Sequence, residues 1–139
     1  MNKKTILLVE DDELDIISVQ RSLLKLDIEY ELFTAYNGRE ALTMLNGPDS
    51  ITPDVILLDL NMPKMNGVEF LKALRDDPVL KSIKVFIMTT SAETVDRDTT
   101  EQLGISGYII KPLNYQDNTK RADSMDAFVQ FHLRKILNG

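Results

Sequence analysis

Thiol and imidazole side chains are scarce in this chain, which contains no cysteine and a single histidine, His132. The absence of cysteine excludes disulfides, zinc–thiolate centres and a cysteine nucleophile, and one histidine alone argues against transition-metal chemistry. No apolar run is long enough to cross a membrane, and Met1 to Thr5 lead into a short strand instead of a signal sequence. We therefore expect a cytoplasmic protein.

Positive charge is also in short supply, because 16 Lys and Arg residues face 22 Asp and Glu residues, for a net charge of −6. Affinity for phosphate backbones needs clustered Lys and Arg, so this balance argues against a nucleic-acid binder. The sequence has no internal repeat and no low-complexity tract. Its 139 residues, 43% of them hydrophobic, are the length of one domain, and we expect residues 1–139 to form a single domain.

Short apolar runs alternate with segments whose apolar residues recur at helical spacing. This alternation is typical of a three-layer α/β/α fold, in which a five-stranded parallel sheet is covered by helices on both faces. The strands are expected at residues 5–9, 30–35, 55–59, 83–88 and 107–110. The helices are expected at residues 13–26, 38–45, 68–76, 90–103 and 124–137. The last helix is expected to bury Phe128, Phe131, Leu133 and Leu137.

Polar residues stand where the predicted strands end. Residues 55–58 are aliphatic at every position, as in a strand buried on both faces, and Asp59 follows directly, before a loop rich in Asn, Pro and Gly. The polar residues at the strand ends are Glu10, Asp11, Asp59, Thr89 and Lys111. Because parallel strands end at one edge of the sheet, where open α/β sheets bind their ligands, these side chains should converge.

Three carboxylates in one pocket repel one another, by about 4 kcal/mol per pair at a separation of about 4 Å and an effective dielectric constant of about 20. They therefore need compensating positive charge. Lys111 supplies one, and Mg²⁺, which prefers carboxylate and phosphate oxygens, would supply more. Such a site favours transfer of a phosphoryl group to Asp59, because metal and lysine neutralise its oxygens while the Thr89 hydroxyl donates to one of them.

Four motifs accompany the strand ends in order. They are Val9-Glu10-Asp11-Asp12, the stretch LLDLNMPKMNG at residues 57–67, Thr89-Thr90-Ser91, and GYIIKP at residues 107–112. Together they resemble the receiver domain of two-component response regulators, and the resemblance extends over nearly the whole chain. It implies the flavodoxin-like (CheY-like) fold, whose parallel strands lie in the order 2-1-3-4-5.

The resemblance also implies a role for each acidic residue of the site. Asp59 falls at the phospho-acceptor position. Glu10 and Asp11 fall at the acidic pair, of which Asp11 would bind Mg²⁺ directly and Glu10 mostly through water. Asn61 falls where the family completes the coordination of the metal with a backbone carbonyl.

The remaining motif positions are implied to sense and hold the phosphoryl group. Thr89 matches the switch hydroxyl, Lys111 the phosphate-binding lysine, and Tyr108 the switch aromatic that turns inward when the threonine moves. Pro112 would follow a cis Lys-Pro bond. The segment 114–123 is longer than the usual link to the last helix, which displaces or extends the region through which receivers commonly meet partners.

The resemblance thus implies a single-domain response regulator of a phosphorelay, a signalling phosphoprotein that catalyses only its own phosphorylation and dephosphorylation. A sensor histidine kinase or phosphotransfer protein would phosphorylate Asp59, and the aspartyl phosphate would control contact with a downstream protein. The stretches at residues 89–93 and 111–114 are similar to receivers that partner phytochrome-like sensor kinases. Homodimerisation through the last helix is plausible for that group.

Three other functions are open to a fold of this kind. A receiver-like module could bind partners without phosphorylation, although the filled key positions argue against it. A haloacid-dehalogenase-like phosphatase also uses a strand-end Asp with Mg²⁺, but that family needs a second carboxylate where Asn61 stands. A flavin or nucleotide binder would need a Gly-rich phosphate loop after the first strand, and none is present.

Overall fold

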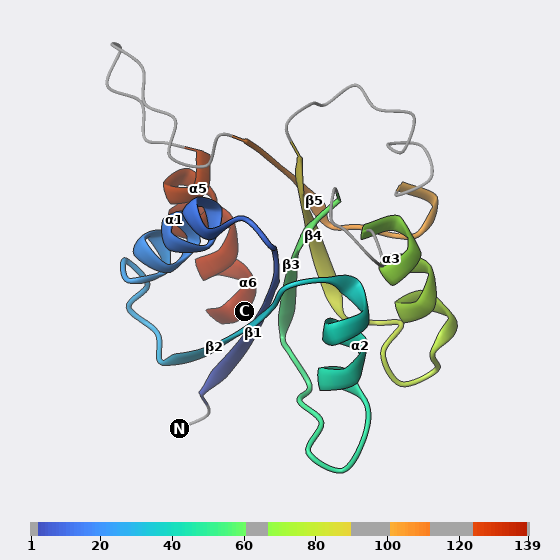
Figure 1. Ribbon diagram of the computed structural model, residues 1–139. Helices are drawn as coiled ribbons and strands as arrows, with labels where there is room; N and C mark the ends of the chain where they lie inside the picture. Colours follow the sequence, from blue (N-terminus) through green and yellow to red (C-terminus); the bar gives the residue numbers. More distant parts are fainter. Residues whose placement is uncertain (1–2, 61–66, 90–100, 112–123, 139) are drawn as a thin grey trace.

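The computed structural model describes residues 3–60, 67–89, 101–111 and 124–138, and the strands in these ranges form one parallel sheet (Figure 1). The strands are β1 (Lys4–Val9), β2 (Tyr30–Ala35), β3 (Val55–Asp59), β4 (Lys84–Thr89) and β5 (Gly107–Ile110). Their order is β2-β1-β3-β4-β5, and each neighbouring pair is parallel. This order confirms the predicted flavodoxin-like topology.

Strand β3 lies at the centre of the sheet, between β1 and β4, and all five of its residues are buried. Its register aligns Leu58 with Val9 on one side and with Ile87 on the other. Because successive side chains point to opposite faces, a strand covered on both faces must be apolar throughout. The aliphatic run that precedes Asp59 therefore follows from the central position of β3.

Helices cover both faces of the sheet, as predicted (Figure 1). The helical elements are α1 (Glu13–Leu23), α2 (Gly38–Leu45), α3 (Gly67–Asp76), α5 (Ser124–Ala127), the π-helical segment η1 (Phe128–Leu133) and α6 (Arg134–Asn138). One core joins α1 and the last three elements to one face of the sheet. The other core joins α2 and α3 to the opposite face, so the sheet is the middle layer of three.

Helix α1 begins directly after the first acidic motif. The Asp12 side chain accepts hydrogen bonds from the backbone N–H groups of Leu14 (2.9 Å) and Asp15 (3.1 Å), which is the geometry of an N-cap. The helix ends at Leu23, three residues earlier than predicted. The N–H groups of residues 24–26 bond to carbonyls three residues back, so the last turn is wound more tightly than an α-helix.

The last helix differs from the prediction in the face that it buries. Phe128 and Leu133 are buried, but Phe131, predicted to face the core, is 67% exposed. A π-helix bonds residue i to residue i+5 and thereby widens the turn. In η1 the residue one turn beyond Phe128 is therefore Leu133 instead of Phe131. The prediction for Phe131 was wrong because the widened turn brings Leu133, instead of Phe131, onto the buried face beside Phe128.

The predicted helix at residues 90–103 falls mostly outside the described residues, but its end is visible. Gly104 has a φ of +77°, the left-handed conformation in which glycine commonly ends a helix. The Arg75 guanidinium of α3 donates to the carbonyls of Leu103 (2.7 Å) and Gly104 (3.1 Å). Arg75 thus joins the end of α3 to the turn that leads into β5.

Gly67, the first residue of α3, lies against the end of β3. Its N–H donates to the carbonyl of Leu60 at 3.0 Å. A Cβ atom at this position would lie 2.6 Å from the Leu60 Cα and 2.7 Å from the Asp59 carbonyl oxygen. Real contacts are never this short, so α3 can begin beside Asp59 only because residue 67 is glycine.

Candidate functional site

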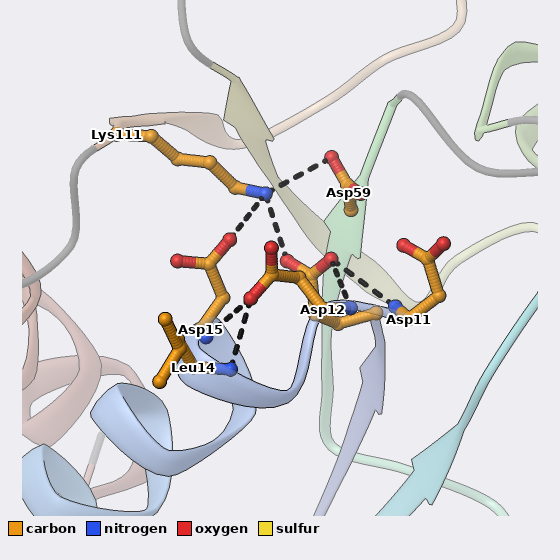
Figure 2. A network of polar contacts seen from close by, with 7 residues as sticks. Asp11, Asp12, Leu14, Asp15, Asp59 and Lys111 are labelled. Atoms are coloured by element: carbon orange, nitrogen blue, oxygen red, sulfur yellow. Dashed lines mark hydrogen bonds and ion pairs between the residues drawn. The ribbon is translucent and has the colours of Figure 1, made fainter.

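Polar residues predicted at the strand ends, among them Asp11, Asp59 and Lys111, converge at the carboxyl edge of the sheet (Figure 2). Glu10 and Asp11 follow β1, Asp59 ends β3, and Lys111 follows β5. The Lys111 side chain crosses to the acids, although it is 101 residues from Glu10 in sequence. Parallel topology brings these groups together because every strand of the sheet ends at the same edge.

Lys111 is the positive centre of the cluster. Its Nζ atom lies 2.8 Å from the Asp15 carboxylate, 2.9 Å from Glu10 and 3.4 Å from Asp59, with the lysine side chain 11% exposed. Burial alone would lower the pKa of Lys111, but the hydrogen bonds with Asp15 and Glu10 and the charge of Asp59 outweigh it and raise the pKa. The ammonium is therefore permanently charged at neutral pH.

The Glu10 side chain is fully buried. One of its oxygens accepts hydrogen bonds from the backbone N–H groups of Asp11 (3.1 Å) and Asp12 (3.3 Å), while the other accepts from Lys111. Burial raises the pKa of Glu10 to about 8, with a further rise from a hydrogen bond shared with Asp59 that the lysine only partly offsets. Glu10 is thus tightly bound on both oxygens.

The acidic residues are arranged to hold a cation. Carboxylate oxygens of Glu10, Asp11 and Asp59 all lie within 4.8 Å of one another. A donor set made only of oxygens suits a hard cation such as Mg²⁺. Asp11 is exposed, and Figure 2 draws no dashed line from its carboxylate to the other labelled residues. Asp11 therefore has the freer carboxylate for direct coordination, and Glu10 suits an indirect role.

Thr89 and Tyr108 lie on the two strands beside the acidic cluster. Thr89, at the end of β4, is 2% exposed, and its carbonyl accepts the backbone N–H of Lys111 at 2.7 Å. Tyr108 on β5 is half-buried and lines a pocket of about 310 Å³ with Phe128 and His132. The switch roles of Thr89 and Tyr108 stay predictions.

One residue of this site was missed by the sequence analysis, and two predicted ones lie outside the described residues. Asp15, in the first turn of α1, makes the shortest ion pair of Lys111 within the part of the chain that the structure describes. Acids at the start of a helix suit its dipole, which made Asp15 look ordinary. The available signal was its place in the first turn of the helix that directly follows the acidic motif, which keeps Asp15 close to the end of β1. Asn61 and Pro112 fall outside the described ranges.

A parallel sheet in this order, with an acidic cluster and a lysine at its carboxyl edge, is the arrangement of two-component signalling proteins. The chain matches the family model of the response regulator receiver domain over residues 6–123. It is 36% identical over 129 residues to response regulator Rcp1 of Synechocystis sp. The alignment covers 90% of this chain and 88% of Rcp1. The chain therefore belongs to the response regulator receiver family.

Solved structures of response regulators share the fold. The Mn²⁺-bound form of Rcp1 gives a TM-score of 0.80 at 33% identity, covering 92% of this chain and 93% of that one. The phosphorylated cyanobacterial phytochrome response regulator RcpA gives 0.76 at 32% identity, covering 97% and 91%. A two-component response regulator from Legionella pneumophila gives 0.76 at 41% identity, covering 96% and 98%. Membership of this family leaves the phosphatase and flavin-binding alternatives without support.

Among the described residues, no helix combines the length and the apolarity that crossing a membrane requires.

Proposed function

We propose that this protein is a phospho-accepting response regulator in which Asp59 receives a phosphoryl group from a sensor histidine kinase or phosphotransfer protein. The observation that carries the proposal is the setting of Asp59. Its buried carboxylate lies 3.4 Å from the Lys111 ammonium and within 4.8 Å of the Glu10 and Asp11 carboxylates. Family membership supports a signalling role of this kind.

In the proposed reaction, an oxygen of the Asp59 carboxylate forms a bond to phosphorus. The bond from phosphorus to the histidine nitrogen of the donor breaks, and its electron pair returns to the imidazole. The product is an aspartyl phosphate. The Lys111 ammonium binds one phosphoryl oxygen, and the Thr89 hydroxyl donates to another, so both groups stabilise charge that builds up during transfer.

A divalent cation is part of the proposal. Asp11 and Asp59 would hold Mg²⁺ with the backbone carbonyl of Asn61, and Glu10 would contribute through water. When bound, Mg²⁺ would neutralise part of the negative charge of the phosphoryl group. The oxygen-only donor set supports this assignment, as does the Mn²⁺ held by the related Rcp1.

The signal would leave the protein through contact with a downstream protein. Inward movement of Thr89 after phosphorylation would make room for the Tyr108 ring and shift the surface around β5 and the last helix. The related RcpA is a phytochrome response regulator, which supports a phytochrome-like kinase as the donor. We propose that the protein acts in the cytoplasm in this pathway and forms a homodimer through the last helix.

The test is intact-mass analysis after incubation with acetyl phosphate, with and without Mg²⁺. We expect one phosphoryl adduct per chain that depends on Mg²⁺ and is absent from Asp59→Asn. Asp49→Asn, which changes an exposed acid in a distant loop, is the matched control and should behave as the wild type.

Two results would count against the proposal. An equal adduct on the Asp59→Asn variant would place the phosphoryl group elsewhere. No adduct on the wild-type protein under any condition would favour the receiver-like module that binds partners without phosphorylation.

A further inference from the structure

Asp15 contributes to the candidate site without belonging to any of the receiver motifs. Among the described residues its carboxylate makes the shortest ion pair of Lys111, at 2.8 Å, whereas Asp59 makes the longest, at 3.4 Å. Figure 2 shows the Lys111 ammonium reaching between the two acids. In this state the lysine is held more closely by the helix than by the proposed phospho-acceptor.

The position of Asp15 is well defined. Its backbone N–H donates to the Asp12 side chain at 3.1 Å, which fixes the first turn of α1. Glu13 stands in the same turn with the same charge, but it is exposed. A general preference of acids for the helix N-terminus would account for both residues equally. It does not account for the ion pair that Asp15 alone of these two makes with Lys111.

An ammonium group has three N–H donors, and three carboxyl groups surround that of Lys111. A phosphoryl oxygen on Asp59 must therefore compete with the acceptors that already engage the ammonium. The side chain of Glu10 is 0% exposed and that of Asp59 is 4% exposed, whereas that of Asp15 is 20% exposed. Asp15 also stands on a helix instead of a strand end, so it is the partner that can move into water.

We propose that Asp15 is a positioning residue that holds the Lys111 ammonium away from Asp59 in the resting protein and competes with the phosphoryl group for it. This inference rests on the proposed function of Asp59 as phospho-acceptor. Each phosphorylation then requires Lys111 to exchange Asp15 for a phosphoryl oxygen. The need for this exchange slows the phosphorylation of the protein.

The experiment compares initial rates of phosphorylation by acetyl phosphate in Mg²⁺, followed by intact mass. Asp15→Asn keeps the shape of the side chain but removes the charge that holds the lysine. We expect this variant to be phosphorylated about three- to fivefold faster than the wild type, the range for a partly exposed ion pair. Glu13→Gln removes the same charge from the same turn without touching Lys111, and its rate should stay within about 1.5-fold of the wild type because exposed charges are screened.

A double-mutant cycle shows whether Asp15 acts through the lysine. Lys111→Met should be phosphorylated far more slowly, and adding Asp15→Asn to it should give no acceleration. Lys111→Gln serves the same purpose if the methionine variant does not fold, and circular dichroism checks each protein.

Three outcomes would overturn the inference while leaving the proposed function intact. In the first, Asp15→Asn is no faster than the wild type. In the second, Glu13→Gln accelerates the reaction as much as Asp15→Asn. The acceleration would then come from the loss of negative charge in this turn and not from the ion pair with Lys111. In the third, the acceleration persists without Lys111. A wild-type protein that takes no phosphoryl group would instead overturn the proposed function, and the inference with it.

Discussion

Burial of the Glu10 carboxyl makes the stability of the metal-free protein depend on pH. The pKa of Glu10 is about 8 in the folded protein, against an ordinary value of 4.5. Below pH 4.5 the group is protonated in both the folded and the unfolded chain. Between pH 4.5 and 8 the unfolded chain loses the proton first, so the free energy of unfolding falls as pH rises through this window.

We therefore expect Glu10→Gln to remove this contribution, since a neutral amide replaces the buried carboxyl. The variant should gain stability relative to the wild type as pH rises from about 4.5 to about 8. Thermal unfolding in a chelator-containing buffer, followed by circular dichroism, measures the difference. Glu31→Gln, an exposed change on β2, is the control. Parallel curves for wild type and Glu10→Gln would contradict the assignment.

At the scale of secondary-structure elements, Gly67 determines how closely α3 approaches β3. The Cβ of Gly67→Ala would meet backbone atoms of Asp59 and Leu60 at 2.7 and 2.6 Å, and backbone cannot yield easily. We expect the variant to lose about 1–3 kcal/mol of unfolding free energy in urea, the usual range for overpacking, and to be phosphorylated more slowly.

Gly107→Ala is the matched comparison for this change. Its Cβ would lie 3.2 Å from the side chain of Phe86, which can shift by a few tenths of an ångström. We expect Gly107→Ala to lose less unfolding free energy than Gly67→Ala. An equal or greater loss in Gly107→Ala would show that the contact between α3 and β3 is not as tight as described.

The elements also show what patterns in the sequence can and cannot predict. The strands were predictable because β3 is buried on both faces and its neighbours follow the same apolar rule, and parallel topology then places Asp59 beside Lys111. Phe131 was predicted on the wrong face because a π-helical turn depends on packing, which leaves no mark on residue spacing. Asp15 was missed because the same acid suits a helix dipole, and only the path of the Lys111 side chain across the sheet edge gives it a second partner.

At the scale of the whole molecule, a buried polar contact joins the first helix, α1, to the C-terminal helix α5. The Ser22 hydroxyl of α1 donates to the Asp126 carboxylate of α5 at 2.6 Å, across 104 positions of sequence. Lys25 pairs with the other oxygen of the same carboxylate, but its side chain is 46% exposed. Ser22 is buried, whereas nearly half of the Lys25 side chain is exposed.

We expect Ser22→Ala to lower the free energy of unfolding by about 1–3 kcal/mol, because it removes a partner from a buried carboxylate. Lys25→Ala should cost less, about 0–1 kcal/mol, since water replaces an exposed cation. Urea titrations of the two variants provide the comparison. A larger effect from Lys25→Ala would mean that the ion pair, and not the buried hydrogen bond, stabilises the contact between α1 and α5.

The contact between Lys111 and Glu10 has a consequence for the order of events during synthesis. A ribosome that adds about 5–20 residues per second needs roughly 5–20 s to travel between positions 101 residues apart. Until β5 has left the exit tunnel and joined the sheet, Asp59 lacks the Lys111 ammonium. The growing chain therefore carries Glu10 and Asp59 without this counter-charge until Lys111 has been added, so the proposed phospho-acceptor site is completed late in synthesis.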